Sequence, residues 1–169
     1  MRKVVYSAAM SLDGHISGPK GESDWIVIDP ELDFGEMFAR FDTILLGRKT
    51  YEMTRSGGGG MPGVKSYVFS RTLQQADARG VTVSDDPLQT VSDLKAQPGK
   101  DIWLFGGGSL FRSLLELGLV DAVEVAIIPV LLGGGVPLLP DTPERAALRL
   151  VEHQVYEKTG TVTLQYAVR

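Results

Sequence analysis

The chain has 169 residues and no cysteine, which excludes a disulfide scaffold, a thiol nucleophile and a cysteine-based metal site. Hydrophobic residues make up 43% and charged residues 22%, as in a folded globular domain, and the net charge of −4 argues against a general binder of nucleic acids or acidic membranes. No apolar run approaches the roughly 20 residues of a membrane span, and the chain enters a strand pattern at once without a signal-like segment. We therefore expect a soluble cytoplasmic protein.

The first predicted elements are a buried strand over residues 4–10 and a loop that extends past residue 24. A helix is then predicted to start at Asp29-Pro30-Glu31, because these residues supply an N-cap acid, a proline at the first helical position and an acid in the first turn. Its apolar face has the spacing i, i+3, i+4, i+7 and comprises Phe34, Met37, Phe38 and Phe41.

The rest of the chain alternates strands and helices before ending in two strands. The predicted strands are 43–46, 66–69, 81–83, 101–105, 122–132 (broken by Pro129), 148–156 and 161–168, and the predicted helices start near 47 and 109 and span 87–96. The glycines at 57–60 are expected to end the helix that starts near residue 47, and Gly118 the helix that starts near 109. The alternation of strands and helices predicts one α/β domain over 1–169 with a mostly parallel sheet of about eight strands. Because residues 158–160 carry a hairpin turn signal, the last two strands are predicted to form an antiparallel C-terminal edge.

Three strand ends carry residues that suit phosphate groups. They are Gly47-Arg48-Lys49-Thr50, Ser70-Arg71 and Gly106-Gly107-Gly108-Ser109. Glycine lets a backbone approach a ligand closely, and the N-terminus of the following helix favours an anion. Each segment alone is equally explained by a tight turn, an exposed helix start or a loop charge, and the Rossmann glycine pattern is absent. Together they suggest a ligand with several separated phosphates, such as NADPH.

These segments resemble the cofactor-binding segments of the dihydrofolate reductases. The resembling stretches are 47–52 and 70–71, each after a strand, and 106–111, which opens a helix. Residues 11–14, 23–26, 119–121 and 129–134 resemble more closely the reductase domain of the bifunctional riboflavin-biosynthesis deaminase–reductase and its stand-alone relatives. The resemblance covers nearly the whole chain and implies the dihydrofolate reductase-like three-layer fold, with helices on both faces of the sheet.

The resemblance also implies an NADPH site. It places phosphates on Arg48, Lys49 and Thr50, the adenosine 2′-phosphate on Ser70 and Arg71, and the diphosphate on Gly107, Gly108, Ser109 and Leu110, with Gly47, Phe105 and Gly106 in the same segments. Ala9 and Ile16 match positions that line the nicotinamide pocket, although plain core packing also explains them.

The resemblance points to two candidate acids and one aromatic contact. Counted back from Gly47, Glu31 falls near the carboxylate that dihydrofolate reductases carry on the first helix, but the first turn of a helix also favours an acid. Asp13 matches the riboflavin-type motif and is equally a turn former. Trp25 can stack on a planar substrate or anchor its loop, and the histidines have no metal-ligand spacing, so no metal is expected.

The implied function is an NADPH-dependent reductase of a small nitrogen heterocycle. The first interpretation is reduction of 5-amino-6-(5-phosphoribosylamino)uracil in riboflavin biosynthesis, and the second is dihydrofolate reduction. A third is a protein that binds NADP(H) without catalysis. By resemblance to the riboflavin-type relatives, we expect a homodimer.

Overall fold

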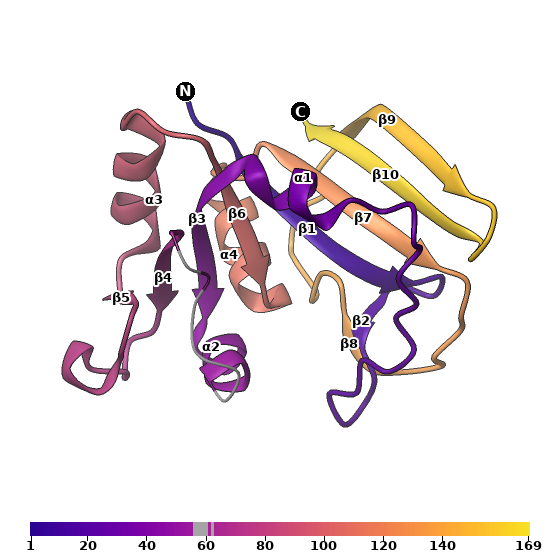
Figure 1. Cartoon of the computed structure of the whole chain (residues 1–169). Coiled ribbons are helices and arrows are strands. Elements are labelled where there is room, and N and C mark those ends of the chain that lie inside the picture. Colours follow the sequence, from indigo (N-terminus) through magenta and orange to yellow (C-terminus); the bar gives the residue numbers. More distant parts are fainter. Residues whose placement is uncertain (56–60, 62) are drawn as a thin grey trace.

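The fold is built on an eight-stranded sheet whose parallel strands all end at one edge. A computed structural model of the chain describes residues 1–55, 61 and 63–169. Within them the strand order is β5-β4-β3-β6-β1-β7-β10-β9, and the first six strands in this order are parallel (Figure 1). Their bounds are Val4–Ser11 (β1), Phe41–Gly47 (β3), Lys65–Phe69 (β4), Thr82–Ser84 (β5), Asp101–Gly106 (β6) and Ala122–Ile128 (β7). Their carboxyl ends therefore converge where α/β sheets bind ligands.

The predicted antiparallel edge is confirmed. Strands β9 (Leu148–Tyr156) and β10 (Thr161–Val168) form a hairpin, and β10 pairs antiparallel with β7. Gly160 adopts φ +74° in the connecting turn, a conformation that glycine tolerates without a steric penalty. The strand predicted to reach residue 132 is shorter, because β7 ends before Pro129, which has no N–H to continue the ladder. A second, two-stranded sheet of β2 (His15–Ser17) and β8 (Val136–Pro137) was not predicted.

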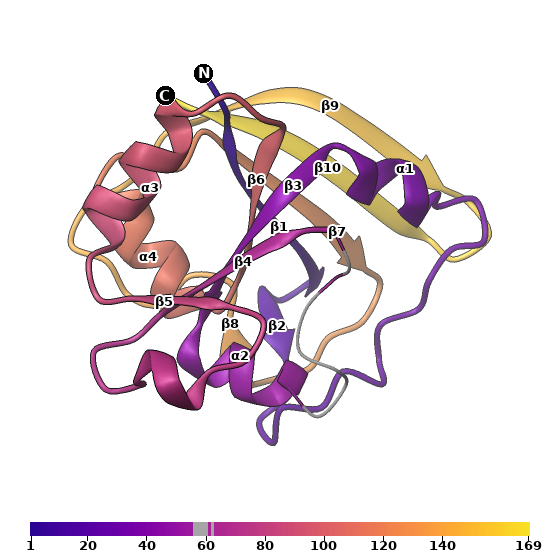
Figure 2. The ribbon, with the colours of Figure 1, turned by 60° about the vertical axis from the view of Figure 1, so that its left-hand side comes forward.

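Helices cover both faces of the sheet, which confirms the three-layer architecture. The helices are α1 (Phe34–Ala39), α2 (Arg48–Arg55), α3 (Pro87–Ala96) and α4 (Gly108–Glu116), with a short 3₁₀ turn at Gln75–Asp77. Because side chains alternate along a strand, Val4 and Tyr6 of β1 join the core cluster that includes α3 and α4, whereas Val5 joins the cluster that includes α2. Figure 2 shows α3 and α4 on one side of the molecule and α1 on the other.

The first helix begins later than predicted, and this part of the prediction is wrong. Helix α1 starts at Phe34, with Asp33 as N-cap accepting from the Glu36 N–H at 2.9 Å. The carboxylate of Asp29 is buried, accepting from the Glu31 N–H at 2.9 Å and from the Thr159 hydroxyl at 2.8 Å. A tertiary contact to the β9–β10 hairpin therefore uses the side chain that local pattern assigned to a helix cap.

Two further boundaries complete the comparison with the predicted elements. Phe41, expected on the first helix, is the first residue of β3. Helix α2 ends at Arg55, and the glycines 57–60 expected to end it lie outside the described residues. In the part of the chain that the structure describes, the helices are too short and too polar for any of them to cross a membrane.

Candidate active-site cleft

A cleft of about 1470 Å³ lies over the carboxyl ends of the parallel strands. It is lined by α1 and the preceding loop, by the N-terminal turns of α2 and α4, and by residues of β1, β7 and β10. Typical small-molecule pockets have roughly 300–1000 Å³. This cleft is therefore large enough for a cofactor and a second ligand side by side.

The three phosphate-suited segments are neighbours at one end of the cleft. In the sheet register Gly47 lies opposite Phe69, and its predecessor Leu46 lies opposite Gly106. A Cβ built on Gly47 would lie 3.7 Å from both the Gly106 carbonyl oxygen and the Gly107 nitrogen. Residues that are far apart in sequence thus form one continuous backbone surface.

The segment before α4 is shaped to receive an anion. Gly107 is the N-cap of α4, and among the described residues no side chain caps this helix end. The first-turn N–H groups therefore keep their hydrogen-bonding capacity beside the cleft, which Gly108, Ser109 and Leu110 line. Gly106, joined to Gly107 by a cis peptide bond, is buried, adopts φ +130° and is not among the lining residues.

The two glycines at this helix start face different surroundings. A Cβ on Gly107 would meet only the Thr50 hydroxyl oxygen, at 3.5 Å, which is ordinary van der Waals contact. A Cβ on Gly108 would lie 3.0 Å from Pro140 and 3.1 Å from the Pro137 carbonyl oxygen. A side chain at position 108 would therefore crowd the 137–140 loop, whereas one at position 107 makes only ordinary contact.

Cationic side chains surround the same end of the cleft. Arg48 is engaged with Glu52, at 2.8 Å, and with the Thr72 hydroxyl. Lys49 and Arg71 are exposed and, within the described residues, make no side-chain hydrogen bond or ion pair. The Ser70 hydroxyl accepts the N–H groups of residues 72 and 73 and so shapes the loop that carries Arg71. Two positive charges are thus available to a ligand.

The floor of the cleft is made of cross-strand rows on one face of the sheet. One row, Ala9–Ala126–Thr163, joins β1, β7 and β10 and consists of small side chains. The next row is Ser7–Glu124–Gln165, which we call the polar row. The small row leaves room on the cleft floor in which a planar ring can lie, and Ile16 of β2 also lines the cleft.

An ion pair at the polar row was missed by the sequence analysis. The Arg40 guanidinium, at the C-cap of α1, contacts the Glu124 carboxylate of β7 and lies 4.6 Å from the centre of the Phe41 ring. The signal in the sequence was a glutamate between two valines of a buried strand, at a position that faces the cleft. Its partner came from a different element and could not be identified from spacing.

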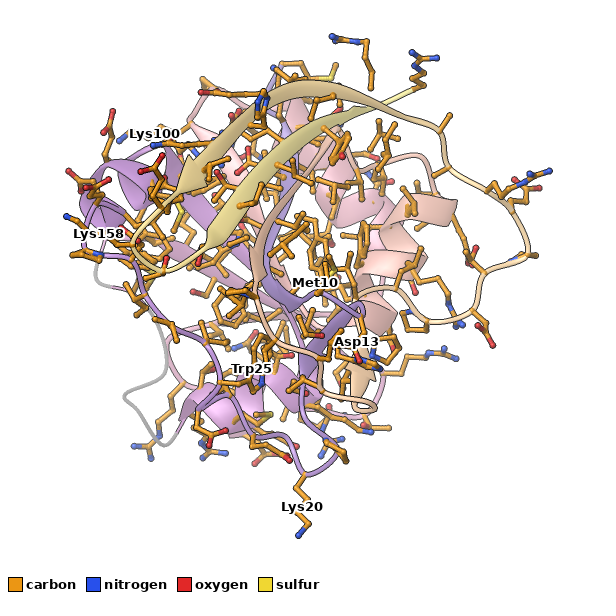
Figure 3. The ribbon with its side chains drawn as sticks, turned by 90° about the vertical axis from the view of Figure 1, so that its right-hand side faces the viewer. Met10, Asp13, Lys20, Trp25, Lys100 and Lys158 are labelled. Carbon is orange, nitrogen blue, oxygen red and sulfur yellow. The ribbon has the colours of Figure 1, made fainter. Side chains whose placement is uncertain are left out.

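The three residues expected to act on the substrate lie in different places. Glu31 lines the cleft, is exposed, and its carboxylate is 3.0 Å from the Lys158 Nζ. Trp25 is not among the lining residues, and its Nε1 donates to the Glu22 carbonyl oxygen at 3.0 Å. Figure 3 shows Trp25 and Asp13 on the loops near the end of β1 and Lys158 at a separate edge.

Asp13 joins two loops and is not a lining residue. Its carboxylate accepts from the Ser11 hydroxyl at 2.7 Å and from the N–H groups of Leu132 and Gly133 at 3.1 and 2.8 Å. These hydrogen bonds, the one from Ser11 foremost, hold the pKa of Asp13 well below its usual range. The carboxylate is therefore ionised at neutral pH and fastens the 11–14 loop to the segment after β7.

Comparisons with known proteins agree with this arrangement. Residues 2–162 match the family described as the RibD C-terminal domain. The Bacillus subtilis (strain 168) protein YyaP, whose name is qualified as uncharacterised, is 37% identical over 181 residues, covering 98% of this chain and 94% of its own length.

Two solved structures share the fold. A Shewanella sp. PV-4 protein named as a candidate riboflavin biosynthesis protein superposes with a TM-score of 0.84 at 25% identity, over 99% of both chains. Dihydrofolate reductase from Enterococcus faecalis, in a complex with NADP(H), gives a TM-score of 0.72 at 19% identity, over 99% of this chain and 96% of its own. The fold is therefore dihydrofolate reductase-like.

Proposed function

Because the chain belongs to the RibD C-terminal domain family, whose dihydrofolate reductase-like members are oxidoreductases, we propose that it is an NADPH-dependent reductase of a small planar nitrogen heterocycle. The proposed substrate is of the 5-amino-6-(5-phosphoribosylamino)uracil type, in riboflavin biosynthesis, and residues 1–169 act as one domain. The observation that carries the proposal is the convergence, beside a row of small residues, of a helix N-terminus and two cations that have no side-chain partner among the described residues.

The residues at the cationic end of the cleft fit a dinucleotide with several phosphates. We assign the diphosphate to the N-terminus of α4, where Gly107 leaves space and the first-turn N–H groups of residues 108–110 are open. Arg48, Lys49 and Thr50 would neutralise and bind phosphate from α2, and Ser70 and Arg71 would hold the adenosine 2′-phosphate. The NADP(H) complex of the enterococcal dihydrofolate reductase, which has the same fold, supports this choice of cofactor.

Hydride chemistry is supplied by the reduced nicotinamide of NADPH when it is bound. The protein's part is to hold the substrate's hydride-accepting carbon against the nicotinamide ring and to exclude water. The Ala9–Ala126 row provides a surface with no bulky side chain, and Ile16 lines the same cleft. The remaining volume of the cleft, toward α1, is available to the substrate.

The proton that accompanies hydride transfer needs a donor that reaches the cleft. Of the two acids expected from the sequence, we assign Glu31 as the candidate, since Asp13 is outside the lining and stays ionised. Glu31→Gln should lower the turnover rate while leaving the dissociation constant of NADPH unchanged. An unaltered turnover rate in this variant would remove Glu31 from the reaction.

NADPH oxidation measured at 340 nm tests the proposed function and its alternatives. Turnover with 5-amino-6-(5-phosphoribosylamino)uracil and none with dihydrofolate is the expected result. Turnover with dihydrofolate alone would establish the second interpretation, which the enterococcal structure favours. NADPH binding without turnover of either compound would leave a protein that binds the cofactor and does not catalyse.

A further inference from the structure

The polar row lies one ring width from the slot proposed for the nicotinamide. Ser7 is two residues before Ala9 on β1, which corresponds to about 7 Å along the strand. Glu124 and Gln165 occupy the matching positions on β7 and β10 and also line the cleft. If the nicotinamide lies over Ala9, a second ring in contact with it can therefore have one of its edges at this row.

The hydrogen-bonding capacity of the row is specific. The Glu124 carboxylate is only an acceptor, whereas the Gln165 amide is both a donor and an acceptor. Together they complement a ring edge that presents an N–H next to a carbonyl oxygen. A purely apolar ring edge would leave the half-buried Gln165 amide without a ligand partner, at a cost in free energy.

Arg40 orients the Glu124 carboxylate. The Glu124 side chain is only 14% exposed, and its contact with the Arg40 guanidinium is an ion pair that joins α1 to β7. The Arg40 Nε is buried and has no hydrogen-bond partner in the described residues, so the pairing depends on Nη2. Arg40 is thus a positioning residue that acts through Glu124.

Aromatic side chains flank the row on the side of α1. Phe38 lies 4.9 Å from Trp103 and Trp103 lies 4.8 Å from Phe105, measured between ring centres, and all three line the cleft. The Trp103 Nε1 donates to the Ser7 carbonyl oxygen at 3.3 Å, which ties this aromatic wall to the row. A planar heterocycle can therefore contact the wall with one part of its surface while its polar edge faces Glu124.

We propose that Glu124 and Gln165 form a recognition subsite for the lactam edge, an N–H beside a ring carbonyl, of the substrate's heterocycle. The inference rests on the proposed function in that it assigns this edge to the reduced substrate. It predicts that the protein selects rings with a free imide or lactam N–H and rejects the same rings once every ring N–H is methylated.

Isothermal titration calorimetry with two small probes tests the subsite. The probes are 5,6-diaminouracil and its 1,3-dimethyl derivative, which has no free ring N–H, each titrated into the protein with and without saturating NADPH. The unmodified protein should bind 5,6-diaminouracil at least tenfold more tightly than the methylated probe. Glu124→Gln should weaken 5,6-diaminouracil about fivefold to tenfold, because a charge-assisted hydrogen bond becomes a neutral one.

Two further variants make the test specific. Glu152→Gln is the matched control: Glu152 lies opposite Gln165 on β9, in the same cross-strand row, but outside the cleft lining, and it should change nothing. Gln165→Leu should reduce the preference between the two probes. If Glu124→Gln shows no cooperative thermal transition and is therefore not folded, Gln165→Leu replaces it as the test of the subsite.

The outcomes separate the subsite from the cofactor proposal. The subsite is refuted if the unmodified protein binds both probes equally or neither, or if a folded Glu124→Gln variant binds 5,6-diaminouracil as tightly as the unmodified protein. If only Gln165→Leu folds, the subsite is refuted when this variant keeps the preference of the unmodified protein for 5,6-diaminouracil over the methylated probe. Absence of NADPH binding by fluorescence would instead refute the reductase function, while selective binding of 5,6-diaminouracil would still uphold the subsite.

Discussion

Replacing Arg71 with alanine should weaken NADPH far more than NADH. The two cofactors differ only in the 2′-phosphate, which is the group that we assign to Arg71 at the end of β4. Arg71 is exposed and makes no side-chain hydrogen bond or ion pair in the described part of the chain. Its removal therefore breaks no side-chain hydrogen bond or ion pair in the described residues, and the stability should stay within about 0.5 kcal/mol of the original.

The size of the effect follows from the kind of bond lost. An exposed ion pair is worth about 0.2–1 kcal/mol, and a hydrogen bond to a charged group about 1.5–3 kcal/mol. Arg71 lines the cleft but remains solvated, so a loss of about 1–3 kcal/mol is expected for NADPH. This corresponds to about a fivefold to 150-fold rise in the dissociation constant, since about 1.4 kcal/mol is a factor of ten.

Titration of the cofactor's fluorescence measures both dissociation constants at fixed ionic strength. Arg79→Ala is the control, because Arg79 is another exposed arginine of the same region that does not line the cleft, and it should leave both constants unchanged. Equal weakening of NADPH and NADH by Arg71→Ala would contradict the assignment. An effect of Arg79→Ala as large as that of Arg71→Ala would point to general electrostatic attraction instead.

Three other predictions concern backbone approach, pH and assembly. Gly107→Ala should weaken NADPH binding with little change in melting temperature. Gly108→Ala, whose Cβ would crowd the 137–140 loop, should destabilise the fold by about 1–3 kcal/mol. A lower melting temperature for Gly107→Ala than for Gly108→Ala would contradict the packing argument. Asp29→Asn should lower the melting temperature at pH 7, and the difference from the unmodified protein should shrink below about pH 4. The hydrogen bond from the Glu31 N–H lowers the pKa of Asp29, so its stabilisation is complete above the unfolded-state pKa of about 3.9 and disappears as the pH falls through the folded-state value. A constant difference across this range would show that the carboxylate's charge is irrelevant. Light scattering at micromolar concentration should give twice the monomer mass, since β9 exposes Leu150 and Val155; a monomer mass would refute the expected homodimer.

Elements with strong local signals were predicted with correct bounds. Helix α3 has an N-cap aspartate, Asp86, followed by Pro87, and these two residues determine its start without any tertiary contact. The β9–β10 hairpin follows from two apolar runs separated by a glycine turn. The strand–glycine–helix junctions were likewise visible, because glycine and cations at strand ends are local features of the chain.

Features that depend on distant partners were missed or misplaced. Asp29 is predicted from the sequence to cap a helix, but in the structure its carboxylate accepts a hydrogen bond from the hairpin residue Thr159, and the helix starts at Phe34. The pairing of β2 with β8 needs segments that lie more than a hundred residues apart. The Arg40–Glu124 pair joins a helix to a strand whose side chains meet only when the sheet order is set.

The sequence alone determined the layered α/β class, most strand and helix bounds, and the presence of three anion-suited turns. These depend on periodicity, capping and glycine, which act over a few neighbouring residues. The tertiary structure decided that the turns meet at one cleft, that Asp13 fastens loops rather than lining it, and that a charged polar row lies on its floor. Such juxtapositions depend on strand order and register, which bring together residues that no local pattern connects.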